Sequence, residues 1–276
     1  KLQTYTSETM TLDVKDGEFF IDDPKSLWKG KSLYDLYQMA YTPWDWHKPI
    51  MERARELGMH CFSTPFDDTA VDFLEDLDVP AYKIASFELI DLPLIRKCAA
   101  QEKPIIMSTG MADLKEIAEA VSVARESGGK DIALLHCTSG YPTPPNEADL
   151  NTLPHLAKAF GVVSGLSDHT GGIGVAVASV ALGASIIEKH FTINRNMEGP
   201  DHAASLEFNE FKKLNDSYKK FGFPFILAIK GKTKTEILNN FKKRIYSDPE
   251  TEFNEAIKQV KQIASLRLKE LNIKDL

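Results

Sequence analysis

The 276-residue sequence has few cysteines and no long apolar run. Its three cysteines, Cys61, Cys98 and Cys137, are an odd number without CxxC spacing, so we predict buried free thiols in a reducing compartment. No run reaches the roughly 18 apolar residues that a membrane span needs, and no signal peptide precedes the first predicted strand. We therefore expect a cytoplasmic protein without a membrane partner.

The sequence also lacks any long basic run. Its 33 Lys and Arg against 40 Asp and Glu give a net charge of 33 − 40 = −7. This balance argues against a nucleic-acid partner, because binding to a phosphate backbone needs clustered positive charge. A local basic pocket for a small anion stays compatible with it. The 43% hydrophobic content supports a sizeable core, enough for one large domain or one domain with a tail.

Seven short strand-like runs recur along the chain, and helical segments such as Thr69–Leu77, Leu89–Ala100 and Ala112–Glu126 separate the later ones. No GxGxxG motif follows any run, and polar residues end nearly all of them. This pattern favours an α/β (β/α)8 TIM-type barrel over a doubly wound sheet. Seven runs leave such a barrel without its first strand, which we expect to be missing upstream of Lys1. The runs are Leu2–Tyr5, Met59–Ser63, Ala81–Ser86, Pro104–Thr109, Ile132–Cys137, Val162–Leu166 and Ser185–His190.

Hydroxyls and lysines end the predicted strands at matching points. One such side chain alone is typical of a loop or a helix cap, but the repetition predicts a shared site at the mouth of the barrel. Lysine supplies charge and hydroxyls supply directional donors, so the set suits a small, multiply anionic ligand such as a phosphorylated acid. The polar strand ends are Lys1, Gln3, Ser63, Thr64, Lys83, Ser86, Glu88, Ser108, Thr109, Thr138, Ser139, Tyr141, Ser167, Asp168, His169, Lys189 and His190.

Two histidines follow successive strands. His169 and His190 flank the predicted buried helix Val175–Leu182, and parallel strands bring equivalent ends to the same side of a sheet. The two imidazoles therefore point into one cleft and could hold a metal ion. The alternative is two structural histidines that only donate and accept hydrogen bonds. Asp168 beside His169, and Glu188 and Lys189 before His190, favour the site.

Glycines follow His169 in the sequence GGIG. Gly171, Gly172 and Gly174 let the backbone approach a ligand closely, and their amides lie near the start of the predicted helix. Such amides favour an anion such as phosphate.

Two further segments differ from the barrel pattern. The aromatic-rich stretch from Ser7 to Ile50 is either a helix packed over the barrel rim, which we favour, or a lid or subunit contact. After Glu207, lysine-rich amphipathic helices are predicted at Ile237–Tyr246 and Glu252–Leu271. We therefore predict a barrel domain over residues 1–207 and a helical tail of different origin over residues 208–276.

The motifs LQTYT, FSTPFD, YKIASFE, IIMSTGM, LLHCTSGYPTP, GLSDHT, IEKHFT and EGPDHAASLE together resemble the sialic acid synthase family. Members of that family condense phosphoenolpyruvate with an N-acetylated amino sugar, releasing phosphate and forming nine-carbon 2-ulosonic acids for surface glycans. The resemblance spans residues 1–207. It implies a phosphoenolpyruvate-dependent transferase with a divalent metal ion, Mn2+ or Mg2+, and a homodimer.

The resemblance also assigns roles to the polar strand ends. It implies that His169 and His190 bind the metal, and that His190, Glu88 and Lys83 are catalytic. The phosphoenolpyruvate ligands would be Lys1, Thr64, Lys83, Ser86, Ser108 and Ser167. The sugar site would include Gln3, Glu88, Ser139, Tyr141 and Asp201.

Within the family, the sequence combines features of two branches. WKGKSLYDLY, the region Trp44–His47 and Ser139, where sialic acid synthases usually carry Asn, resemble pseudaminic acid synthases. NRNMEGPDHAASLE resembles the sialic and legionaminic branch. More motifs indicate the pseudaminic branch, which we therefore expect.

Parts of the family pattern are missing from the sequence. The resemblance implies an upstream glutamate that acts on the attacking water, and a C-terminal domain that completes the dimer; we expect both to be absent. Residues 214–271 instead resemble the C-terminal part of ureidoimidazoline (OHCU) decarboxylases, where only Arg267 matches a functional position, so we expect no decarboxylase activity. The alternatives to an active synthase are a truncated or chimeric chain that binds phosphoenolpyruvate and metal without turnover, and another metal-dependent barrel aldolase or hydrolase.

Overall fold

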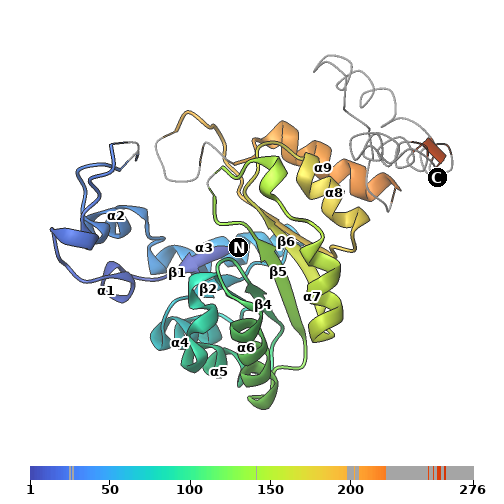
Figure 1. The fold of residues 1–276 in the computed structure, drawn as a ribbon. Helices are drawn as coiled ribbons and strands as arrows, with labels where there is room; N and C mark the ends of the chain where they lie inside the picture. The colour runs from blue at the N-terminus through green and yellow to red at the C-terminus, as the bar shows by residue number, and fades with distance from the viewer. Residues whose placement is uncertain are drawn as a thin grey trace.

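The computed structural model describes residues 1–221, apart from 25, 27, 141, 198–201, 203 and 204, and also residues 248, 251, 254, 255 and 258. Seven parallel strands form one sheet in sequential order (Figure 1). This confirms the predicted α/β fold and its seven strands, since each strand of a barrel pairs with the next along the chain. The strands are β1 (Leu2–Thr4), β2 (Ser63–Pro65), β3 (Tyr82–Ile84), β4 (Ile105–Ser108), β5 (Ile132–Cys137), β6 (Val163–Asp168) and β7 (Ile186–Lys189).

The sheet is an open barrel in the part of the chain that the structure describes, because β1 pairs with β2 alone and β7 with β6 alone. The prediction for the second strand was wrong by several residues. Met59 still donates to Ala54 O at the end of the preceding helix, and pairing with β1 begins at Ser63, opposite Leu2. The strand therefore starts where its neighbour is available, which local sequence cannot show.

Helices on the outer face connect successive strands. Asp67, Asp91 and Asp113 cap three of them by accepting backbone N–H groups of the first turn. The predicted single helix Leu89–Ala100 is divided by its cap at Asp91 into a 3-10 helix, η3 (Phe87–Ile90), and α5. The connecting helices are α4 (Asp68–Asp76), α5 (Leu92–Ala99), α6 (Leu114–Glu126), α7 (Thr152–Phe160) and α8 (Gly174–Ala181), and a 3-10 turn, η4 (Pro145–Glu147), precedes α7.

The main core lies between the sheet and helices α4, α5 and α6. Leu74, Ile84, Ile95, Met107 and Leu134 belong to one cluster and are fully buried. Successive side chains of a strand point to opposite faces, so the residues between these apolar positions point to the inner side of the sheet. The alternation that builds the core therefore also turns Lys83 and Ser108 to the inner face, beside apolar residues such as Ile106 and Leu135.

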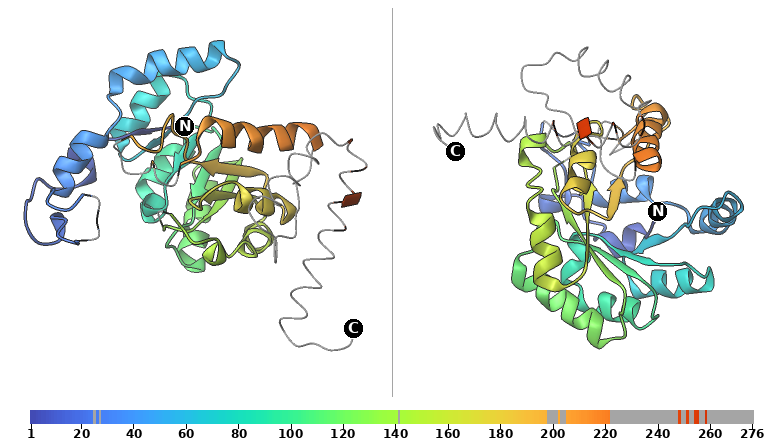
Figure 2. Two further views of the ribbon diagram at one scale, coloured as in Figure 1. Left: turned by 90° about the horizontal axis from the view of Figure 1, so that it is seen from above. Right: turned by 90° about the vertical axis from the view of Figure 1, so that its right-hand side faces the viewer.

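The aromatic-rich segment packs at the ends of β1 and β2. The rings of Tyr37 and Tyr5 contact edge-on at 5.9 Å, and Trp44 Nε1 donates to Tyr5 O at 3.2 Å. These contacts support the rim interpretation, while α1 and α2 extend to one side of the sheet (Figures 1 and 2). The segment comprises α1 (Ser7–Met10), η1 (Gly17–Phe19), α2 (Leu33–Ala40), η2 (Trp44–Trp46) and α3 (His47–Glu56).

One helix of the predicted tail is described. In α9 (Phe208–Phe221), Leu214 packs with Ala176 and Val177 of α8 and with Ile187 of β7. Nearly all of the tail beyond α9, including the helices predicted from residue 237 onward, lies outside the described residues. The boundary between 207 and 208 therefore stays a prediction.

Two compositional predictions concern cysteines and membrane spans. The three cysteines are free thiols; Cys98 and Cys137 are buried, whereas Cys61 is only partly buried. No helix in the described part of the chain is both long and apolar enough to cross a membrane.

Strand β6 lies very close to β5 and β7 at Gly165, so a substitution there tests the packing. A Cβ there would collide with Ile186 O and with the side chain of Leu135. We expect Gly165→Ala to lower the free energy of unfolding by about 1–3 kcal/mol, measured by urea denaturation. Gly174→Ala is the control, because a Cβ at Gly174 meets nothing within 4 Å; equal stability of both variants would contradict the packing.

Candidate active site

A cluster of charged and hydroxyl side chains lies on the inner face of the sheet. Lys83 Nζ donates to Ser108 Oγ at 2.6 Å and to Ile84 O at 2.9 Å. Ser167 Oγ donates to Glu188 Oε1 at 3.0 Å. Lys1 Nζ lies 2.9 Å from Glu188 Oε2, and Lys83 Nζ lies 3.9 Å from Glu188 Oε1. Four of the predicted phosphoenolpyruvate ligands thus converge, since Lys83, Ser108 and Ser167 face inward on their strands and Lys1 directly precedes β1.

Burial and charge set the ionisation of this cluster. Burial lowers the pKa of Lys83 to about 8, although the Glu188 carboxylate opposes this shift. Burial by itself would raise the pKa of Glu188, but the charges of Lys83 and Lys1 outweigh it and lower that pKa to about 2. Two ammonium groups therefore face one carboxylate, which leaves one positive charge in excess near pH 7.

Glu188 was expected only as a carboxylate close to His190, without a binding or catalytic role of its own. It lies two residues before His190 and pairs in register with Ser167, so the strand period would have placed it on the inner face. The signal was present in the spacing, but only the structure shows that its carboxylate lies between two lysines.

Two other predicted site residues carry unsatisfied polar atoms. Thr64 Oγ1 and Glu88 Oε2 are buried without a hydrogen-bond partner among the described residues. Burial also raises the pKa of Glu88, which favours its protonated form. A buried polar atom without a partner costs free energy unless a ligand or water satisfies it. The observation supports ligand-facing roles for both residues.

Ser86 and Ser139 lie close together because a glycine separates them. A Cβ on Gly110 would collide with Ser86 and come within 3.2 Å of Ser139 Oγ. The ends of β3, β4 and β5 therefore meet at this point. Gln3 pairs in register with Thr64 on β2 and is exposed. The predicted sugar residues Tyr141 and Asp201 lie outside the described residues.

The two predicted metal ligands are neighbours. The ring centroids of His169 and His190 are 5.3 Å apart, directly after β6 and β7. His169 Nδ1 lies 3.0 Å from Thr138 O, so the ring donates there from Nδ1 and Nε2 is its basic nitrogen. Burial, and then the charge of His190, lower the pKa of His169, which favours the neutral form that binds metal.

The donor set fits a divalent transition ion. Two imidazoles suit Mn2+ better than Mg2+, which proteins hold through oxygen. Among the described residues no group of three or more His, Cys, Asp or Glu forms a ligand cluster. The two histidines would therefore share the ion with water or substrate oxygens.

The interpretation of Asp168 and Lys189 as part of the same cleft was wrong. Lys189 Nζ lies 2.8 Å from Asp168 Oδ2, and both side chains are almost completely buried. Because Ser167 and Glu188 face inward, alternation turns Asp168 and Lys189 to the other face of the sheet. The following residues, His169 and His190, return to the side of the lysine cluster.

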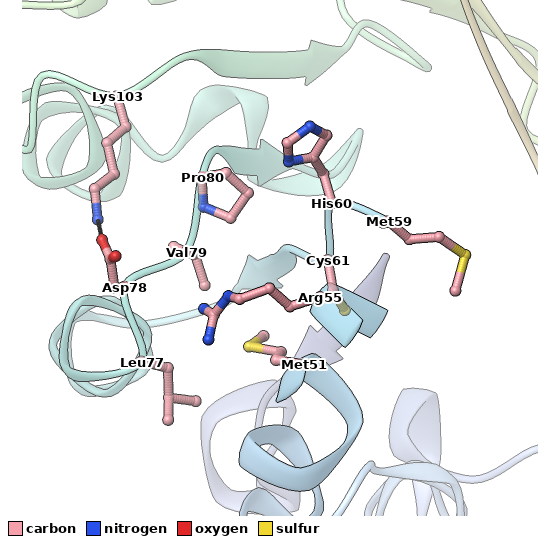
Figure 3. Close-up of a pocket in the computed structure, with 10 residues that line it drawn as sticks. All are labelled: Met51, Arg55, Met59, His60, Cys61, Leu77, Asp78, Val79, Pro80 and Lys103. Carbon is pink, nitrogen blue, oxygen red and sulfur yellow. Dashed lines mark ion pairs between the residues drawn. The ribbon is translucent and has the colours of Figure 1, made fainter. Parts of the chain in front are cut away.

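One cavity adjoins the site, and another lies at the opposite end of the sheet. A cavity of about 360 Å³ lies on the inner side of the sheet, where Lys1, Glu188, Ile106 and Leu135 line it together with Phe211 of α9. A second cavity, of about 340 Å³, lies at the amino-terminal ends of β2, β3 and β4, among residues that include Arg55, His60, Asp78 and Lys103 (Figure 3). In a parallel barrel that end serves stability, so the first cavity is the one adjoining the candidate site.

The fold and these side chains define a (β/α)-barrel protein with a basic, hydroxyl-lined cluster beside two histidines at the carboxyl ends of its strands. The chain belongs to the NeuB family, whose model matches residues 1–222. This confirms the family resemblance of the sequence. A model for OHCU decarboxylase matches residues 192–269, which overlaps the end of the first match and confirms the second resemblance.

Individual relatives agree with the family. The chain is 46% identical over 220 residues to the pseudaminic acid synthase of Helicobacter pylori, covering 80% of this chain and 64% of that protein. It is 45% identical over 195 residues to the N,N'-diacetyllegionaminic acid synthase of Campylobacter jejuni, covering 70% and 58%. The chain thus spans less than two thirds of the length of these curated relatives.

A solved relative shows the same fold. The crystal structure of N-acetylneuraminic acid (sialic acid) synthetase from Leptospira borgpetersenii, in complex with citrate, superposes with a TM-score of 0.64 at 33% identity. The match covers 66% of this chain and 64% of that one.

Glu188→Gln tests the charge cluster. Glu188 has a lowered pKa, so its stabilisation is complete above pH 4.5 and is lost as the pH falls towards 2. We expect the variant to lose about 2–4 kcal/mol of unfolding free energy at pH 7, because Lys83 stays buried with less compensation. The difference from the wild type should shrink below pH 4.5.

Thermal and urea unfolding between pH 7 and pH 3 would measure this. The control is Glu56→Gln, since Glu56 forms an exposed ion pair with Arg53 and should contribute little at any pH. A difference for Glu188→Gln that does not change with pH would contradict the assignment.

Proposed function

We propose that this chain acts in the condensation of phosphoenolpyruvate with an N-acetylated amino sugar, giving a nine-carbon 2-ulosonic acid and phosphate. The observation that carries the proposal is the inner-face cluster of Lys1, Lys83, Ser108 and Ser167 next to His169 and His190. The lysines and hydroxyls of this cluster suit an anion, and the two imidazoles beside them suit a metal ion. Membership of the NeuB family supports the same chemistry.

Phosphoenolpyruvate would lie against the inner-face cluster. Its phosphate and carboxylate would be bound by Lys83 and Lys1, with the hydroxyls of Ser108 and Ser167 as directional donors. Thr64, whose hydroxyl is buried without a partner among the described residues, and Ser86 would complete the set. The substrate anion would compete with Glu188 for the two lysines.

His169 and His190 would hold the divalent ion, Mn2+ in preference to Mg2+. When bound, the ion supplies Lewis acidity that polarises the open-chain aldehyde of the sugar. The C=C bond of phosphoenolpyruvate would supply the electrons with which its methylene carbon bonds to the aldehyde carbon, and the aldehyde oxygen would take up a proton. Water would add at the adjacent carbon and lose a proton, and the C–O bond to phosphate would then break to leave the keto group and inorganic phosphate. Lys83 would bind the developing charge on the phosphate side.

Glu88 would contact the sugar. Its pKa, which burial raises, and its unsatisfied Oε2 suit a group that exchanges a proton with the substrate. Gln3, Ser139, Tyr141 and Asp201 would line the same side, Ser139 next to Ser86.

The amino sugar that we propose is a precursor of pseudaminic acid. The Helicobacter pylori relative is named for that product, and the sequence motifs in the aromatic-rich segment point the same way. The second candidate is a precursor of legionaminic acid, because the chain is 45% identical to the N,N'-diacetyllegionaminic acid synthase of Campylobacter jejuni.

Isothermal titration of the purified chain with phosphoenolpyruvate, with and without Mn2+, tests the site. We expect binding that strengthens with Mn2+, and loss of that coupling in the His169→Ala/His190→Ala variant. Adding the amino sugar and measuring phosphate release then distinguishes turnover from binding alone. A folded wild-type sample that binds neither ligand would refute the proposed site.

The pH dependence of binding tests Lys83 separately. The ammonium form binds the anion and is lost as the pH rises through about 8, so the Kd for phosphoenolpyruvate should rise roughly tenfold per pH unit above that value. Lys83→Arg keeps its charge and should remove this dependence, even if binding is weaker. Equal affinity of the wild type at pH 7 and pH 9.5 would exclude this role of Lys83.

A further inference from the structure

We propose that the buried ion pair between Asp168 and Lys189 positions His169 and His190 relative to each other and thereby sets the affinity of the metal site. The inference rests on the proposed function, because it gives the two histidines a metal ion to bind. Both residues of the pair are then positioning residues, which act on the ion only through the neighbouring imidazoles.

The register of β6 and β7 gives the geometric basis. Asp168 and Lys189 are partners in the last register pair of the two strands. His169 directly follows Asp168, and His190 directly follows Lys189. The centroids of the two imidazole rings are 5.3 Å apart. A bond between the side chains of the last pair therefore holds together the two strand ends from which the imidazoles project.

The pair also holds the loop after β6. Asp168 Oδ1 accepts hydrogen bonds from Thr170 N at 2.9 Å and from Thr170 Oγ1 at 2.7 Å. Lys189 Nζ donates to Thr170 O at 2.6 Å, in addition to its contact of 2.8 Å with Asp168 Oδ2. The residues on both sides of His169 are thus bonded to the residue that precedes His190.

Both side chains of the pair are shielded from water. The side chain of Asp168 is 0% exposed and that of Lys189 is 2% exposed. A buried ion pair is weak support for stability, because desolvation offsets the attraction, but in some proteins such a pair selects one geometry, which is the role we assign to this one. Two imidazole nitrogens that share one metal ion must each lie within a few tenths of an ångström of the bonding distance. The location of the pair fits that requirement.

The first test measures metal affinity. Free Mn2+ is followed by electron paramagnetic resonance during titration of the full chain, with folding checked by circular dichroism. We expect Lys189→Met to weaken Mn2+ binding about 10- to 100-fold, as for other residues that orient metal ligands. Lys189→Arg, which can still pair with Asp168, should recover most of the affinity.

A matched control separates positioning from stability. Lys103 Nζ lies 2.8 Å from Glu75 at the opposite end of the barrel, so Lys103→Met also removes a partly buried ion pair. It should lower the Tm without changing the affinity for Mn2+. If Lys189→Met changes the Tm alone, and the folded variant binds Mn2+ like the wild type, the inference is overturned.

A second test needs no metal. The native thiols are first removed by Cys61→Ser, Cys98→Ser and Cys137→Ser, because Cys137 Sγ lies only 3.8 Å from His169 Nδ1. In the His169→Cys/His190→Cys variant of that background, dibromobimane links two thiols that lie close together, and its fluorescence reports the rate. We expect Lys189→Met in this background to slow the cross-linking several-fold. An unchanged rate would overturn the inference. If the wild-type chain fails to bind Mn2+, the proposed metal site is refuted, and the cross-linking rate alone decides whether the pair positions residues 169 and 190.

Thr170→Val is a milder variant that can be tested if Lys189→Met does not fold. Thr170→Val removes one hydrogen bond to Asp168 and keeps the ion pair. We expect a three- to tenfold loss of Mn2+ affinity, in line with one buried hydrogen bond. Wild-type affinity and wild-type cross-linking in this variant would count against the inference.

Discussion

The two-residue alternation of parallel strands is the constraint on which the rest of this structure depends. In β3, Tyr82 and Ile84 lie under the helices, and Lys83 between them is turned to the inner face. A lysine that is 1% exposed is tolerated only with partners, and it finds them in Ser108, Ile84 O and the charge of Glu188. The same strands therefore carry the core side chains on one face and the side chains of the candidate site on the other.

Alternation also sorts the charges at the ends of β6 and β7 into two layers. Inside, Lys1 and Lys83 face one carboxylate, Glu188, which leaves positive charge for an anion. On the other face, Asp168 and Lys189 neutralise each other. In the function that we propose, the inner layer would exchange partners with the ligand, whereas the outer layer would keep the same partners.

Two polar atoms at the rim of the inner cluster lower the local stability of the fold. Thr64 Oγ1 and Glu88 Oε2 are buried without partners in the described part of the chain, a cost that a ligand would offset. Burial raises the pKa of the Tyr37 phenol, and the nearby charge of Glu88 raises it further. The aromatic-rich segment that carries Tyr37 therefore adjoins the sugar side of the proposed site, although it packs as a rim element.

The sequence by itself determined the number, type and order of the strands, because apolar runs separated by helical segments are a local pattern. It also determined which polar side chains end the strands, including the two histidines, and the family. Only the tertiary structure decided where β2 begins, since pairing with β1 selects Ser63 over Met59. It also decided that Glu188 lies between two lysines and that Asp168 pairs with Lys189 on the opposite face. The physical reason is that a side chain's face follows from strand register, whereas its partner is set by residues distant in the sequence that packing brings together.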